Sequence, residues 1–158
     1  MQWLKIRTIS PRATAPRSSA LEFQETMVAL IRTLGLHQPD RTPCGQPVPV
    51  GEAHALLELG REPGLSQNGL ASRLRLEKSS VSRIVTALEK RGWVARNRLA
   101  RDTRIVQVHL TDEGRAASAT LAASRQARFE RIFAAIPAAE RDDVLTSLDT
   151  LVQVIRET

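Results

Sequence analysis

One predicted helix presents short hydroxyl side chains and an arginine opposite an apolar stripe. Over residues 78–91 the apolar positions recur at helical spacing, which predicts a buried face of Val81, Ile84, Val85 and Leu88. The opposite face carries Ser79, Ser80, Ser82, Arg83 and Thr86. Such side chains can enter the major groove of DNA and hydrogen-bond to base edges. A polar surface helix is the alternative, although four hydroxyls are unusual on a merely solvated helix because these residues are mediocre helix formers.

The basic charge of the chain is concentrated around that helix. The segment from Arg73 to Arg104 holds ten Lys or Arg and three Asp or Glu residues, a net charge of +7, whereas the whole chain of 158 residues carries +6. The remainder therefore sums to −1. A concentration of this kind favours a nucleic-acid partner, although a solvated basic face would have the same composition.

Three further side chains could bind a metal ion or sense an oxidant. Cys44 lies in a proline-rich segment ten residues before His54, and His37 lies at the end of the preceding predicted helix. Thiolate and imidazole groups are ligands for zinc and for softer metals. The spacing matches no standard metal motif, so a packing role for Cys44 and a small organic effector in place of a metal both stay open.

The remaining chemistry gives little support for an enzyme. The three histidines are scattered over unlike elements, and no serine or cysteine lies in a nucleophile motif. The single cysteine cannot form an internal disulfide, which agrees with a reducing cytoplasm. No apolar run approaches the roughly 20 residues that span a bilayer. We therefore expect a cytoplasmic protein that is not an enzyme.

The elements that must position these side chains are mainly helical. Apolar residues at helical spacing predict a helix over 20–36, and a loop with four prolines follows over 37–50. A short helix is predicted over 52–59. Ser66 is a good N-cap and opens the next helix, which runs to about Leu74.

A hairpin and two more helices follow the polar-faced helix. Gly92 ends that helix, and strand-like residues on each side of a polar tip over 97–102 predict two antiparallel strands. Thr111 is a good N-cap for a long Ala-rich helix that ends before Pro137. The last helix carries an apolar seam that suits packing against another helix, made of Val144, Leu148, Leu151 and Ile155.

The order helix, helix, helix, hairpin is that of a winged helix-turn-helix. The segment LASRLRLEKSSVSRIVTALEKRGWVARNRLARDTRIVQVHLTDEGR closely resembles the signature of the MarR family. Within it, VSRIVTALEKRG resembles the recognition helix, DTR the Asp-x-Arg of the wing, and LTDEGR the entry to the long dimerisation helix. The resemblance is dense from Glu52 to Arg115, and the flanking predicted helices agree with the family plan.

The resemblance implies a mainly α fold with a small β-hairpin wing. A flexible arm over residues 1–19 would precede a single MarR-like domain over 20–158. Within this domain, the winged helix-turn-helix lobe that binds DNA would span 52–110. The dimerisation helices would span 20–37 and 112–158.

The resemblance also implies how such a lobe would contact DNA. The recognition helix would enter the major groove with Lys78, Ser79, Ser80, Ser82, Arg83 and Thr86. The wing would reach the adjoining minor groove, with Arg98 and Arg101 at its tip. Asp102 and Arg104 would form an ion pair that stiffens the wing.

A sequence-specific, double-stranded-DNA-binding transcription regulator is the function that the resemblance implies. We expect a homodimeric repressor that binds a pseudo-palindromic operator and is released by an effector. The effector would be a small organic ligand in the cleft between the lobe and the dimer helices, or a metal ion or oxidant at Cys44, His54 and His37. A regulator without a small effector is a further alternative. A sequence-indifferent architectural protein is the alternative, and it would bind random DNA equally well.

Two residues depart from the family pattern. Arg75 occupies a turn position where glycine is common, so a strained turn is expected. Glu77 occupies the N-cap position of the recognition helix, where Ser or Asp is commoner.

Overall fold

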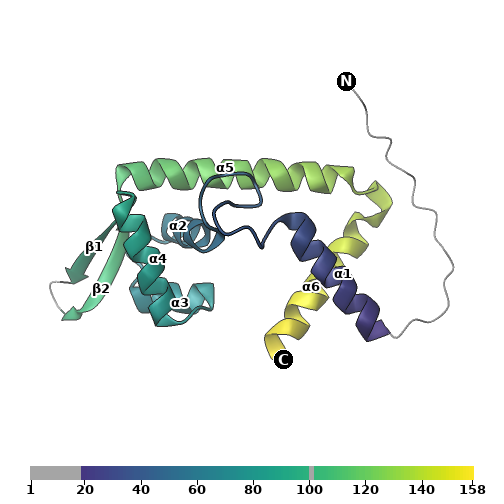
Figure 1. The fold of residues 1–158 in the computed structure, drawn as a ribbon, viewed down its shortest axis with the longest axis horizontal. Helices are drawn as coiled ribbons and strands as arrows, with labels where there is room; N and C mark the ends of the chain where they lie inside the picture. Colours follow the sequence, from purple (N-terminus) through teal and green to yellow (C-terminus); the bar gives the residue numbers. More distant parts are fainter. Residues whose placement is uncertain (1–18, 100–101) are drawn as a thin grey trace, which may run out of the picture. The chain divides into compact units, whose positions relative to one another are not determined.

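Helices flank a single hairpin in the part of the chain that the structure describes (Figure 1). The structure, a computed structural model, describes residues 19–99 and 102–158. Three helices precede the hairpin: α2 (Val50–Arg61), α3 (Gln67–Leu74) and α4 (Lys78–Lys90). The hairpin consists of β1 (Val94–Leu99) and β2 (Asp102–Leu110). It is followed by α5 (Asp112–Ala135), the 3-10 turn η1 (Ala138–Glu140) and α6 (Arg141–Glu157). The predicted fold class, mainly α with a two-stranded wing, is confirmed.

The chain divides into two compact units, residues 1–37 and 38–158. The first unit contains α1 (Ser19–Leu34), whose large apolar side chains Leu21, Phe23 and Ile31 are exposed. The predicted arm lies outside the described residues except for Ser19, which begins α1. The second unit contains all the other elements. No helix in the described part of the chain is both long and apolar enough to cross a membrane.

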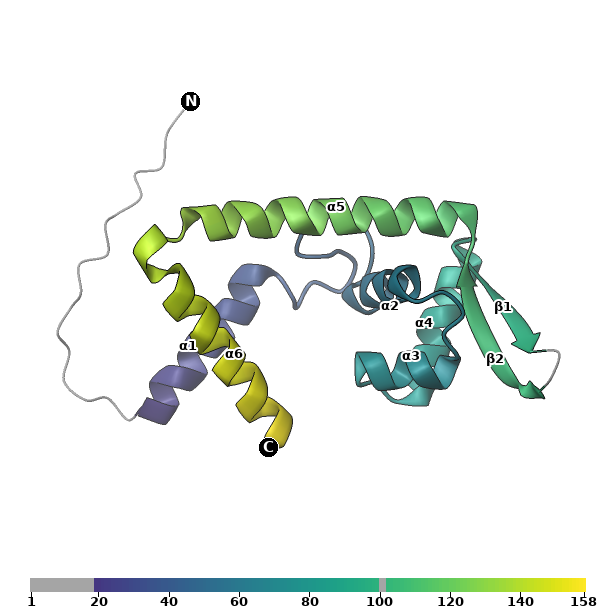
Figure 2. The same ribbon diagram turned by 180° about the vertical axis from the view of Figure 1, so that it is seen from behind.

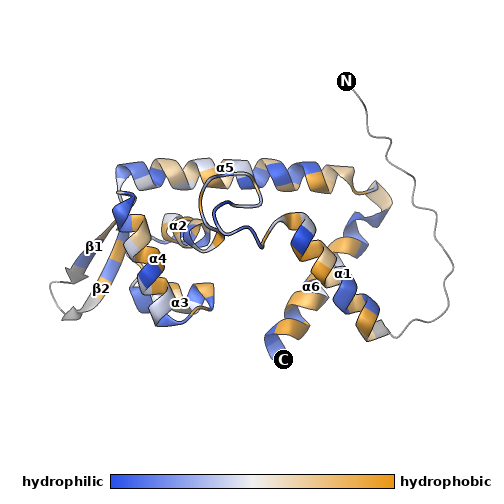
Figure 3. Cartoon of the chain, in the orientation of Figure 1, coloured by the Kyte–Doolittle hydropathy of each residue, from blue (hydrophilic) through white to orange (hydrophobic). Residues whose placement is uncertain are grey.

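The core of the second unit forms where α2, α3, α4 and the hairpin meet. Seven large side chains are fully buried there: Leu56, Leu59, Leu70, Val81, Val85, Leu88 and Val108. Leu121 brings the first half of α5 into the same core, so that half of α5 lies along α2 (Figure 2). Outside this core, α6 keeps apolar residues along its length (Figure 3), and several of them are exposed.

Two of the predicted helix caps are present. Ser66 Oγ accepts a hydrogen bond from the Gly69 amide at 3.0 Å, and Thr111 Oγ1 accepts one from the Gly114 amide at 3.0 Å. Each bond satisfies an amide that would otherwise lack an intrahelical partner. Glu77, by contrast, makes no side-chain cap bond at the start of α4. The turn before it holds Arg75 at φ 53°, in the left-handed region where glycine is favoured.

The first turn of α5 lies directly on the base of the wing. The amide of Thr111 donates to the Trp93 carbonyl at 3.1 Å, and its hydroxyl donates to the Gly92 carbonyl at 2.7 Å. A Cβ atom added at Gly114 would lie 1.9 Å from the Trp93 carbonyl oxygen. Glycine is therefore required at this position, which explains the glycine of the LTDEGR motif.

The hairpin is longer than the sequence predicted. Its register runs from Val94 opposite Leu110 to Arg98 opposite Val106, and the pairing shifts between Arg98 and Leu99. The predicted tip over 97–102 is therefore wrong at both ends, because Asn97 pairs with Gln107 and Asp102 pairs with Leu99. Polar side chains are compatible with a hairpin strand that has a solvated face, so the polarity of this stretch was a misleading signal for a turn.

Candidate nucleic-acid interface

Helix α4 separates an apolar face from an exposed polar face. Val81, Val85 and Leu88 are buried against the core, as the spacing predicted, whereas the fourth predicted residue, Ile84, is half-buried. The predicted reading set faces outward, except that Ser80 is half-buried, and the exposed members are Lys78, Ser79, Ser82, Arg83 and Thr86. Arg83 Nη2 donates a hydrogen bond to the Ser80 hydroxyl at 3.4 Å. A shallow hollow of about 300 Å³ lies on this face, lined by Ser82, Arg83, Thr86, Ala87 and Lys90.

Arg96 is a member of this surface that the sequence analysis missed. From β1 its Nη2 atom donates to the Thr86 hydroxyl at 2.8 Å and to the Ser82 carbonyl at 3.3 Å. Its Nη1 atom forms an ion pair with Glu89 at 3.3 Å. These contacts join the wing to α4. The signal was present in the sequence, because Arg96 lies two residues after the buried Val94 and so shares its face of the strand.

The four predicted wing residues are not tested by the structure. Arg98, Asp102 and Arg104 belong to the two strands, but their side chains lie outside the described residues. Arg101 lies outside the described residues altogether. The ion pair between Asp102 and Arg104, and the contact of this tip with a minor groove, stay predictions.

Part of the basic charge near α4 is neutralised within the lobe. Arg73 pairs with Glu58 at 3.4 Å and also with Glu62, and Arg91 pairs with Glu52 at 2.9 Å while lying 5.2 Å from the ring centre of Trp93. Each pair joins the basic segment to α2 or to the residue after it. Among the described residues Lys78, Arg83 and Lys90 have no carboxylate partner. The described cations of the basic segment that stay available for a polyanion are therefore these three residues of α4 and the exposed Arg75 in the turn before it.

Cys44 lies in a loop that is tied to α5. Its sulfur is 3.0 Å from the hydroxyl of the buried Thr42, and Gln46 Nε2 donates to Ser124 Oγ at 2.9 Å. His54 is exposed on α2, and the exposed His37 belongs to the other unit. Among the described residues no group of three or more His, Cys, Asp and Glu side chains could hold a metal ion. A sensing role for Cys44, His54 and His37 stays a prediction.

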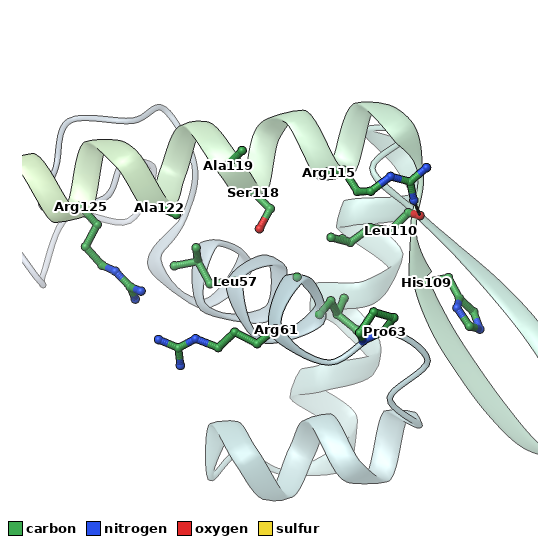
Figure 4. A pocket seen from close by; sticks show the side chains of 12 residues that line it. Leu57, Arg61, Pro63, His109, Leu110, Arg115, Ser118, Ala119, Ala122 and Arg125 are labelled. Atoms are coloured by element: carbon green, nitrogen blue, oxygen red, sulfur yellow. Dashed lines mark hydrogen bonds between the residues drawn. The ribbon is translucent and has the colours of Figure 1, made fainter.

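A cavity of about 410 Å³ opens between α2, the end of β2 and α5 (Figure 4). Its lining includes the apolar side chains Leu57, Leu59, Leu110, Ala119 and Ala122, and the cationic side chains Arg61, Arg115 and Arg125. Arg115 Nη1 donates to the Leu110 carbonyl at 2.9 Å, and its Nη2 bonds Asp112. Arg61 of α2 and Arg125 of α5 lie toward one end of this lining and Arg115 of α5 toward the other (Figure 4), and the two helices come together only in the folded unit, so spacing could not have grouped these arginines.

This arrangement defines a winged helix-turn-helix protein: a three-helix core, a polar-faced third helix and a hairpin fastened to it. The family model described as the MarR family matches residues 46–105. That segment is therefore similar to the MarR family, in agreement with the resemblance stated from the sequence.

Similar proteins are known by sequence and by structure. A protein of Thauera aromatica, proposed as the transcriptional regulator of the hcr operon, is 29% identical over 100 residues, which are 63% of this chain and 60% of that relative. The chain thus spans less than two thirds of that relative's length. Streptococcus pneumoniae FabT, solved in complex with DNA, has a TM-score of 0.66 at 22% identity over 88% of this chain and 94% of FabT.

The PcaV transcriptional regulator of Streptomyces coelicolor, solved in complex with its natural ligand, has a TM-score of 0.58 at 27% identity. The match covers 92% of this chain and 96% of PcaV. The matched family and these relatives are transcription regulators rather than enzymes, in agreement with the prediction that this chain is not an enzyme.

Proposed function

We propose that this chain is a DNA-binding transcription regulator that reads a pseudo-palindromic operator with α4 and represses the genes next to it. The observation that carries the proposal is the exposed set of hydroxyls and unpaired cations on α4, opposite the face that buries Val81, Val85 and Leu88. FabT has this fold and was solved on DNA, which supports a DNA partner here. A DNA partner and the lone cysteine both favour a cytoplasmic location.

Selection of bound sequences from a random pool of double-stranded DNA tests this function. A regulator should enrich one pseudo-palindrome with an affinity on the order of 10³-fold or more above random DNA. An architectural protein would instead leave the pool unenriched while binding all of it. The same selection, repeated at several salt concentrations, separates phosphate contacts from base contacts because only the former release counterions in proportion to their number.

We propose further that the regulator acts as a homodimer. Leu145, Leu148 and Ile155 of α6 are 47%, 45% and 58% exposed, which is costly for large apolar side chains in water. A second copy of the chain would cover them, and a two-fold dimer presents two copies of α4 to two half-sites. The two-fold symmetry of the protein would then appear in the operator.

We propose the cavity between α2 and α5 as the effector site. The lining combines apolar walls with the cationic side chains of Arg61, Arg115 and Arg125, which suits a small organic anion. Arg115 also holds the Leu110 carbonyl at the end of β2, so an anion that draws its guanidinium away would loosen the base of the wing. PcaV, which was solved with its natural ligand, has the same fold and supports a ligand-controlled regulator.

Benzoate is a suitable first probe for the effector site. Fluorescence anisotropy on the selected operator should report release at millimolar benzoate for the wild-type protein and much weaker release for Arg125→Ala. Arg131→Ala is the matched control, because it removes an exposed arginine of the same helix outside the cavity and should respond like wild type. Equal benzoate responses of wild type and Arg125→Ala would contradict the assignment of this cavity.

A further inference from the structure

Thr86 makes a different hydrogen bond from the other threonines of the long helices. Thr120, Thr146 and Thr150 each donate to the carbonyl four residues back, at 3.0, 2.8 and 2.9 Å. Thr86 instead accepts from Arg96 Nη2 at 2.8 Å. Since a hydroxyl has one hydrogen and two lone pairs, this contact uses a lone pair and leaves the hydrogen of Thr86 for another acceptor.

Arg96 also occupies the carbonyl that Thr86 would otherwise use. Its Nη2 atom lies 3.3 Å from the Ser82 carbonyl oxygen, four residues before Thr86. The ion pair with Glu89 at 3.3 Å orients the guanidinium from its other end. The three contacts hold a donor against the Thr86 hydroxyl and occupy the carbonyl to which it would otherwise donate, so its hydrogen is left for an acceptor outside the lobe.

The hollow beside Thr86 is rich in donors. Arg83 and Lys90 line it and have no acceptor atom in their side chains, and Ala87 contributes only a methyl group. Apart from the Ser82 hydroxyl, the polar side chains around the hollow are therefore set to donate. In the major groove guanine presents two adjacent acceptors, N7 and O6, whereas cytosine presents a donor and adenine an acceptor beside a donor.

We propose that Arg96 is a positioning residue that fixes Thr86 as a hydrogen-bond donor, and that the hollow beside Thr86 selects a guanine in each half-site. This inference rests on the proposed function, because it assumes that α4 lies in a major groove. A backbone phosphate is also an acceptor, and the experiment below distinguishes it from a guanine edge.

Selection from a random DNA pool should be run in parallel on wild type, Thr86→Val, Arg96→Gln and the double variant. Wild type should enrich guanine at one position that Thr86→Val and Arg96→Gln both lose, while the other positions are kept. The double variant should lose no more than either single variant, because the two residues act through one contact. Arg156→Gln, the same chemical change on the distant end of α6, is the control and should leave the preference unchanged.

A modified operator tests the acceptor directly. Replacing the selected guanine by 7-deazaguanine removes N7 and should weaken wild-type binding by about 3- to 10-fold, the effect of one hydrogen bond. The same replacement should leave the affinity of Thr86→Val unchanged. If Thr86→Val weakens all sequences evenly and the modified base has no effect, the acceptor is a phosphate and the guanine assignment is wrong.

The role of Arg96 has its own test. If Arg96→Gln shows no thermal unfolding transition and is therefore unfolded, Glu89→Gln is tested in its place. The Glu89→Gln variant removes only the ion pair that orients Arg96, and it should reduce the same guanine preference. Retention of the full preference in the folded variant would overturn the positioning role. A wild-type protein that enriches no sequence at all would instead contradict the proposed function itself.

Discussion

Arg83 carries the largest set of donors on the exposed face of α4 and has no carboxylate partner among the described residues. Arginine reads guanine through two parallel hydrogen bonds, and each good pair of this kind discriminates by about 1–3 kcal/mol. We therefore expect Arg83→Ala to weaken operator binding by that amount and to relax the preference at one base pair per half-site.

Competition binding on the selected operator and on single-base variants measures this effect. Arg156→Ala serves as the control, because it removes another exposed arginine, which lies in α6 rather than α4. Unchanged affinity and unchanged base preference in Arg83→Ala would mean that another face of the lobe meets the DNA.

Arg75 is a strained residue whose effect is on stability. Its φ of 53° lies in the left-handed region, which costs a residue with a Cβ atom about 1 kcal/mol or more relative to glycine. Replacing Arg75 by glycine would relieve this strain, but part of the gain in stability is offset because glycine adds entropy to the unfolded chain. We expect Arg75→Gly to raise the free energy of unfolding by about 0.5–1 kcal/mol, as measured by urea denaturation.

Arg75→Ala separates backbone strain from side-chain effects. It removes the same side chain but keeps the Cβ atom, so it should show no such gain. Equal stabilisation by alanine and by glycine would show that the arginine side chain, rather than the backbone, is the unfavourable feature.

At the scale of elements, the close contact between the first turn of α5 and the base of the wing fixes α5 to the lobe. Gly114 lets the first turn of α5 approach the Trp93 carbonyl, where a Cβ atom would lie at 1.9 Å. Backbone atoms cannot yield as a flexible side chain can, so Gly114→Ala should lower the free energy of unfolding by about 3 kcal/mol, the upper range for overpacking. Thermal and urea denaturation measure this loss.

Gly51→Ala is the matched control for that substitution. Its new Cβ would meet only the end of the Ile84 side chain, at 3.2 Å, and alanine is the better helix former within α2. We expect this variant to be neutral or slightly stabilising. A similar loss of stability in both variants would mean that glycine is required at position 114 by helix packing in general and not by the contact with Trp93.

For the whole molecule, the exposed apolar side chains of α6 are among the features of the described residues that a single chain leaves unexplained. Of the predicted seam, Val144 and Leu151 are half-buried, and Leu148 and Ile155 are exposed. Placing a charge in the proposed dimer interface should be costly, since a buried unpaired carboxylate is strongly unfavourable. Leu148→Asp should therefore shift the protein to monomer at micromolar concentration.

Light scattering after size-exclusion chromatography checks this shift. Gln153→Asp introduces the same charge at an exposed polar position of α6 and should leave the assembly unchanged. A wild-type protein that is already monomeric at micromolar concentration would rule out the proposed homodimer and the two-fold operator that follows from it.

Local signals in the sequence predicted the elements well because their causes are local. The caps at Ser66 and Thr111 and the buried stripe of α4 depend on residues within a turn or two of each other, and the structure bears them out. The strained turn expected at Arg75 is present for the same reason. The bounds of the wing tip were predicted wrongly, since polarity alone does not distinguish a turn from a solvated strand.

What the tertiary structure decided is which distant side chains meet. Arg96 contacts Thr86 and Glu89 across the junction of wing and helix, and the cationic cavity collects Arg61, Arg115 and Arg125 from two helices. Such contacts depend on the packing of whole elements, which a one-dimensional pattern does not encode. The sequence by itself therefore determined the type of lobe and the polar face of α4. Which hydroxyl of that face is held as a hydrogen-bond donor, and the cavity between α2, the end of β2 and α5, depend on the folded chain.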